Sequence, residues 1–184
     1  GRTTEAEAVV REDLRRLARM AEERSSVELA LGRTRDAVAS IDRSVAWTRA
    51  ANARAAAGAA GAAGAAATGE RDPEVEAEAA RAIAFAEANV GRILESTGEL
   101  RGAIERYERF LVWARARAAA DPEDLTVRAN ASLILDRIGR LEVFELEMAD
   151  AGIARMREAV AMMRRVRDRH PGSAAVARDL VARL

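Results

Sequence analysis

The chain has 184 residues, with 30 acidic and 30 basic side chains and no cysteine. The formal net charge of zero excludes the basic surface with which a whole domain binds nucleic acid. The missing thiols exclude disulfides, thiolate metal sites and cysteine nucleophiles. Alanine and arginine dominate, and this composition favours helices. The longest uncharged stretch, residues 55–69, is shorter than the ~20 apolar residues of a membrane span, so we expect no membrane contact and a cytoplasmic location.

The first predicted helix covers residues 4–31, where Val10, Leu14, Leu17 and Ala21 recur at helical spacing. Gly32 is expected to end it. A partner helix is predicted over residues 34–56. The side chains expected on its inner side are Ala37, Val38, Ile41, Val45 and Trp47.

An alanine and glycine run follows, and we read residues 57–70 as an insertion between structural units. Alanine favours helix, but each glycine costs about 1 kcal/mol of helix stability. A frayed helical extension that leads into a mobile linker is one interpretation of this run. A close-packed face of small residues is the other.

Two more helix pairs are predicted, over residues 73–120 and 122–169. Pro73 and Pro122 suit the first position of a helix, because proline has no backbone N–H to leave unsatisfied there. The first pair is expected to turn at Gly98 and the second near residues 149–152. A short terminal helix over residues 172–184 completes a count of seven.

The chain repeats itself. Proline returns every 49 residues, at positions 73, 122 and 171, and the pattern that begins at Gly32 returns 66 residues later at Gly98. A fixed internal period of this size is typical of a solenoid, in which each unit buries its apolar face against the next.

The repeat motifs resemble the tetratricopeptide family. In the second unit they are Val90-Gly91, Leu94, Gly98, Ala103, Tyr107, Phe110 and Pro122, and in the third Ile138-Gly139, Gly152-Ile153, Met156, Ala159 and Pro171. The resemblance covers roughly residues 8–184, although the period of 49 exceeds the family norm. It implies a single domain, an all-α right-handed solenoid of three helix pairs plus the terminal helix. The long units are similar to tandem repeats in large bacterial signalling proteins.

Catalytic chemistry finds little support in the sequence. His170 is the only histidine and stands at a helix junction, so no second histidine or cysteine can join it in a metal or catalytic site. Trp47 and Trp113 occupy equivalent positions in the repeat, and we expect their rings to fill the space between one unit and the next. We therefore predict no catalytic residue, no metal and no cofactor.

The candidate binding residues are Asn89, Arg92, Asp136 and Arg140. The two arginines directly follow the repeat glycines, on first helices, which in the tetratricopeptide family line the concave groove. The two guanidinium groups could form bidentate hydrogen bonds with a carboxylate or phosphate on a peptide. A set of solvated arginines is the other interpretation. The expected function is a non-catalytic module that binds a protein or peptide, and the alternative is a structural spacer or a self-association segment.

Overall fold

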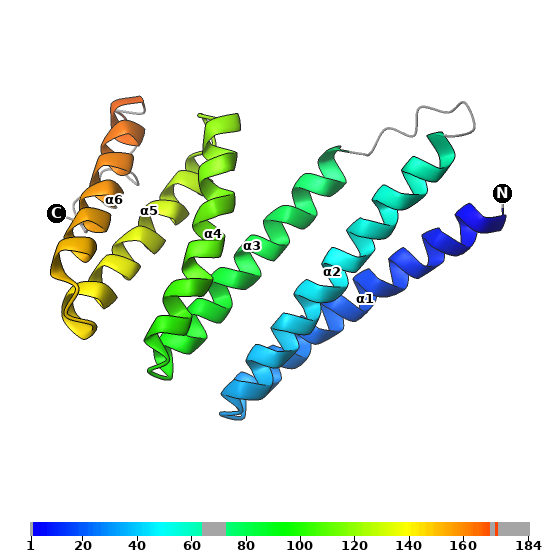
Figure 1. Ribbon diagram of the computed structural model, residues 1–184, viewed down its shortest axis with the longest axis horizontal. Coiled ribbons are helices and arrows are strands. Elements are labelled where there is room, and N and C mark those ends of the chain that lie inside the picture. The colour runs from blue at the N-terminus through cyan, green and yellow to red at the C-terminus, as the bar shows by residue number, and fades with distance from the viewer. Residues whose placement is uncertain (1, 64–72, 170–171, 173–184) are drawn as a thin grey trace. The chain divides into compact units, whose positions relative to one another are not determined.

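A computed structural model of the chain describes residues 2–63, 73–169 and 172, which form six α-helices and one short π-helix (Figure 1). The elements are α1 Arg2–Ala30, α2 Thr34–Ala63, α3 Pro73–Ser96, α4 Leu100–Ala120, α5 Leu125–Arg140, the π-helix η1 Leu141–Glu145, and α6 Ala149–Arg169. No strand occurs within these ranges, so the predicted all-α class is confirmed. No helix in the described part of the chain is both long and apolar enough to cross a membrane. Apart from Gly172, the predicted terminal helix over residues 172–184 lies outside the described residues.

Two glycines end helices in the same way. Gly32 has a φ of 71° and Gly98 a φ of 81°, a left-handed conformation that only glycine adopts at low cost. After α1, Arg33 N donates to Glu28 O at 2.7 Å, and after α3, Glu99 N donates to Leu94 O at 2.9 Å. These six-residue closures are Schellman motifs. The predicted breaks at both glycines are therefore confirmed, with the same geometry in each.

The two Asp-Pro junctions differ from each other. Helix α3 begins at Pro73 as predicted, but α5 begins at Leu125 and not at Pro122. Asp121 folds the intervening residues into a turn by accepting from Glu123 N at 3.1 Å. Asp124 then caps the helix by accepting from Val127 N at 3.0 Å. The second acidic residue, placed where its side chain reaches the first free N–H groups, sets the start of the helix.

The Ala/Gly run is helical further than expected. Helix α2 continues to Ala63, so the first residues of the predicted insertion at 57–70 belong to a helix. Alanine's helix propensity outweighs the cost of Gly58 and Gly61 here. Residues 64–72 lie outside the described part of the chain.

The break in the third predicted pair lies earlier than expected. Helix α5 runs into η1, where Leu146 N donates to Leu141 O at 3.1 Å, and the chain turns at residues 146–148 with Glu147 at a φ of 56°. Gly152, read from the sequence as part of a turn, lies inside the first turns of α6 and is buried. Phe144, the next apolar residue at helical spacing after Ile138 and Leu141, is 70% exposed because it lies in the π-helical turn and not in a continued α-helix.

Gly152 is needed for a close crossing of α5 and α6. A β-carbon on Gly152 would lie 2.5 Å from Gly139 O, and one on Gly139 would lie 2.6 Å from Met156 Cγ. Distances under 3 Å leave no room for a side chain, so the two glycines let the helix backbones approach each other. Ser132 Oγ donates to Ala159 O at 3.2 Å and adds a polar contact at the same interface.

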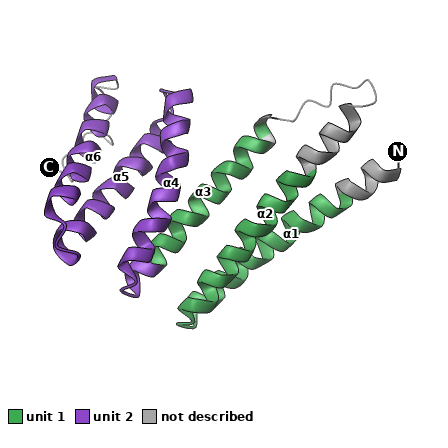
Figure 2. Cartoon of the chain, in the orientation of Figure 1, with its two compact units in different colours: residues 1–93 green, residues 94–184 purple. Residues whose placement is uncertain are grey.

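The chain divides into two compact units, residues 1–93 and residues 94–184, with the boundary inside α3 (Figure 2). In unit 1, α1 and α2 lie side by side (Figure 1). Its buried apolar residues are mostly small: Ala18, Ala21, Ala37, Ile41, Val45, Ala51, Ala84, Val90 and Ile93.

Unit 2 has a core of large side chains. Helix α5 packs against both α4 and α6. The fully buried side chains there include Tyr107, Phe110, Leu111, Leu135, Ile138 and Met163. The tryptophans expected to plug the repeat contacts, Trp47 and Trp113, are only half-buried. Trp113 lies at the edge of this core, with its ring centroid 5.8 Å from that of Phe110.

Candidate functional site

The four residues predicted from the sequence fall into two pairs. Asn89 and Arg92 are exposed on α3 in unit 1, and Arg92 makes no hydrogen bond or ion pair with the described residues. On α5 in unit 2, Arg140 Nε donates to Asp136 Oδ2 at 2.9 Å. Asp136 is 9% exposed, so this pair is half sheltered from solvent. That all four residues share one ligand groove stays a prediction.

A groove that sequence analysis missed lies in unit 1. It encloses about 440 Å³, within the usual range for ligand sites, and three helices line it. Its walls are Glu12, Arg15, Ala18, Arg19 and Glu22 on α1, Thr48, Ala51 and Asn52 on α2, and Glu78, Ala79 and Ala82 on α3.

The floor of this groove consists of alanine. Ala18 and Ala51 are buried beneath it, while Ala79 and Ala82 lie on the α3 wall. A methyl group fills far less space than the branched side chains that normally close a helix interface, so the space between the three helices stays open. An incoming side chain can therefore enter this space and meet the alanine methyl groups at its base.

The rim of the groove is charged, and part of its charge is already neutralised. Glu12 pairs with Arg19 at 3.2 Å and with Arg15 at 3.9 Å. Glu22 accepts from Ser44 Oγ at 3.0 Å. Glu78 is exposed and has no hydrogen-bonding or ionic partner among the described residues. The α3 side of the rim therefore offers a carboxylate that is free to meet a cation.

Buried polar contacts hold the α1 and α2 walls in place. Glu28 is 5% exposed and accepts from Arg24 Nε at 2.6 Å and from Ser40 Oγ at 2.7 Å. Arg43 Nη2 donates to the same Ser40 hydroxyl at 2.8 Å. The hydrogen bond from Ser40, with help from Arg24, lowers the pKa of the Glu28 carboxyl from its ordinary value. Burial without these partners would have the opposite effect.

A second polar cluster joins three helices in unit 2. Tyr107 Oη donates to Glu95 Oε2 at 2.6 Å, and Arg137 Nη1 lies 3.2 Å from that carboxylate and 3.3 Å from the phenol oxygen. Burial, with the Glu95 charge beside it, raises the pKa of Tyr107 to about 12. The phenol therefore stays protonated at neutral pH, and the cluster fixes α4 and α5 against the end of α3.

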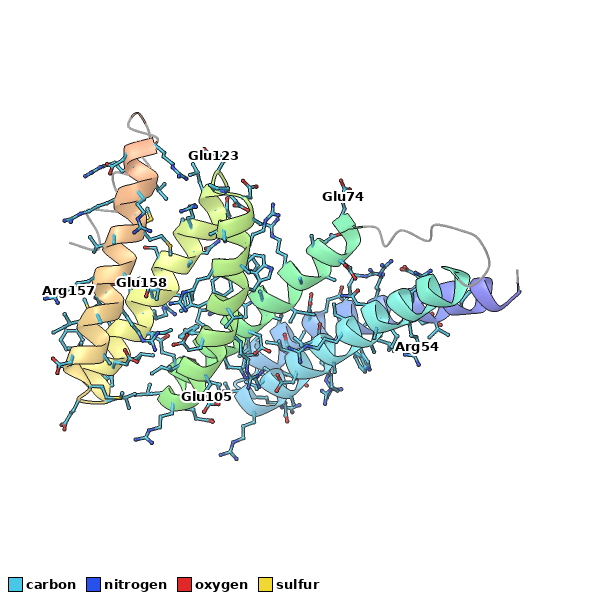
Figure 3. All side chains as sticks on the ribbon, turned by 45° about the horizontal axis from the view of Figure 1, so that its top comes forward. Arg54, Glu74, Glu105, Glu123, Arg157 and Glu158 are labelled. Atoms are coloured by element: carbon cyan, nitrogen blue, oxygen red, sulfur yellow. The ribbon has the colours of Figure 1, made fainter. Side chains whose placement is uncertain are left out.

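A third cluster surrounds Arg155 on α6. Its Nε lies 3.0 Å from both carboxylate oxygens of Glu142, which is nearly buried on η1, and its Nη2 pairs with Glu108 on α4. Further out, Arg115 pairs with Glu158 at 3.0 Å; Figure 3 shows Glu158 on α6. The Arg155–Glu108 pair and the Arg115–Glu158 pair both join α6 to α4.

These clusters are structural in character. Each buried carboxylate already has its hydrogen-bonding partners, and the described residues contain no group of three potential metal ligands. No family model, curated protein or solved structure matches the chain. The groove of unit 1 is the feature best suited to hold a ligand.

Proposed function

We propose that this chain is a non-catalytic protein-interaction module that binds a peptide segment in the groove between α1, α2 and α3. The observation that carries the proposal is the open groove with an alanine floor and a charged rim. We further propose that its helices form tetratricopeptide-like pairs in a right-handed solenoid. The matching Schellman ends at Gly32 and Gly98 support that proposal. In the same view, the module belongs to a larger bacterial signalling protein.

The groove favours one type of ligand. Its floor accepts a single apolar side chain, which supplies most of the binding energy once it is removed from water. Glu78 then favours a basic residue next to that apolar anchor, because the two arginines and two glutamates of the α1 wall balance each other in charge and Glu78 does not share in that balance. The expected ligand is therefore a peptide with an apolar residue next to an arginine or lysine.

The residues predicted from the sequence have a secondary part in this proposal. Arg92 and Asn89 lie on α3, the helix that carries one wall of the groove, and Arg92 is free to contact an acidic group of the ligand. Arg140 is already paired with Asp136, so we assign it a structural contribution.

Selection from a random peptide library on the immobilised chain tests the proposal. Ala82→Trp fills the groove from an exposed position on α3, and Ala80→Trp places the same side chain on the same helix at an exposed position outside the groove. Selected peptides should bind the Ala82→Trp variant at least about tenfold more weakly, a change of ~1.4 kcal/mol, and should bind the Ala80→Trp variant normally. Thermal melting of both variants checks that they fold.

Equal binding to the two variants would reject the groove. Loss of binding only in a double Arg92→Glu/Arg140→Glu variant would instead support the arginine site predicted from the sequence.

A further inference from the structure

Helix α1 carries an apolar stripe on its outer side. Its members, with their exposed fractions, are Val10 at 40%, Leu17 at 39%, Met20 at 55% and Val27 at 58%, and Leu31 at 62% continues the stripe in the turn that follows the helix. Val10, Leu17 and Leu31 are separated by multiples of seven residues, and so are Met20 and Val27. This is the heptad pattern of a helix that packs along another helix.

The stripe is distinct from the face that α1 buries against α2. That inner face consists of Ala18, Ala21, Ser25 and Glu28. At 3.6 residues per turn, the centre of the stripe lies roughly a right angle around the helix from the inner face and about 160° from the groove residues of α1. A partner helix on the stripe would therefore leave both α2 and the groove undisturbed.

Charged residues in the same heptads indicate what the partner is. Asp13 and Arg24 interrupt the stripe at its own heptad positions, and Arg16 and Glu23 flank it on one side. Asp13, Arg16 and Glu23 are exposed and make no ion pair with the described residues. Arg24 pairs with Glu28, yet 66% of its side chain stays accessible. Asp13 and Arg24 form one pair of opposite charges, at equal distances from the midpoint between Val10 and Val27. Arg16 and Glu23 form a second pair, centred one residue further along the helix.

An antiparallel second copy of α1 satisfies the stripe positions from Val10 to Val27 at once. If Leu17 packs against the partner's Met20, the same register pairs Val10 with the partner's Val27 and Asp13 with the partner's Arg24. Arg16 then comes within two residues of the partner's Glu23, about 3 Å along the axis. Two-fold symmetry makes every one of these contacts twice.

A parallel pair would be much worse. In register, it would place Asp13 against Asp13 and Arg24 against Arg24 of the two copies, and like charges at the centre of a helix interface are destabilising. We propose that two copies of this chain associate through the α1 stripe in an antiparallel, two-fold arrangement. The inference does not depend on the peptide groove, since the two surfaces lie on different sides of α1.

Sedimentation equilibrium from about 1 µM to about 1 mM tests this, because dimer formation depends on concentration. The chain should show a monomer–dimer equilibrium that Leu17→Glu/Met20→Glu abolishes. Val112→Glu is the matched control, since Val112 is 69% exposed on α4 and lies outside the stripe. It should leave the equilibrium unchanged.

Charge reversal then tests the orientation. Arg16→Glu and Glu23→Arg should each weaken the dimer about tenfold, since each turns two attractive contacts into repulsive ones, and the double variant should restore it. A chain that stays monomeric throughout, or a dimer that survives Leu17→Glu/Met20→Glu, would overturn the proposal. A double variant that associates no better than the single ones would overturn the antiparallel register. Peptide binding measured on the monomeric variant separates this result from the groove proposal.

Discussion

The two units differ in the size of the side chains that they bury. In unit 1, α1 and α2 meet through alanines, serines and the buried Glu28 carboxylate, whereas unit 2 packs Tyr107, Phe110 and other large side chains. Large apolar side chains bury more surface and contribute about 25 cal/mol per Å² removed from water. We therefore expect unit 2 to supply most of the stability, whereas the small side chains of unit 1 leave the groove open.

The largest effect should come from the core of unit 2. Phe110 is 1% exposed, so Phe110→Ala should lower the free energy of unfolding by about 3–5 kcal/mol. Trp113→Ala removes a larger ring from a half-buried position and should cost clearly less. Chemical denaturation followed by circular dichroism gives both values. A greater loss for Trp113→Ala would mean that the repeat tryptophans, and not Tyr107 and Phe110, form the core.

A smaller and pH-dependent effect is expected in unit 1. Because the pKa of Glu28 is lowered in the folded state, its ionised form stabilises the fold above about pH 4.3, the ordinary value for a glutamate. That contribution is lost as the pH falls through the lowered folded-state value. Glu28→Gln should therefore be less stable than the parent at pH 7, and the difference should shrink on acidification. A difference independent of pH would show that Glu28 acts through packing alone.

Many of the helix boundaries can be predicted from the local sequence, whereas the groove cannot. Gly32 and Gly98 predict their turns because a left-handed residue is required there, and α4 ends at Ala120, where the predicted helix pair ends. The start of α5 was misplaced because Asp121 and Asp124 both suit a cap, and only their side-chain contacts decide between them.

Gly152 was misread for a related reason. A glycine that ends a helix and a glycine that lets two helices touch look alike in a sequence, and only the position of Gly139 on α5 distinguishes the two. The groove depends in the same way on which alanines face one another, a long-range property that helical periodicity does not carry. Arg92 is predicted from its place after a repeat glycine, and the sequence does not single out Glu78 because an exposed glutamate is common on any helix.

Native-state hydrogen exchange tests the contrast between the units most directly, because amide protection reports the stability of each segment. The slowest amides should be those of residues 107–111 on α4 and 135–138 on α5, where the largest side chains are buried. The amides of residues 18–28 on α1 should exchange clearly faster, through openings that leave unit 2 folded. Amides on α1 as slow as those on α4 would contradict this account and would mean that the small-residue packing of unit 1 is as stable as the core of unit 2.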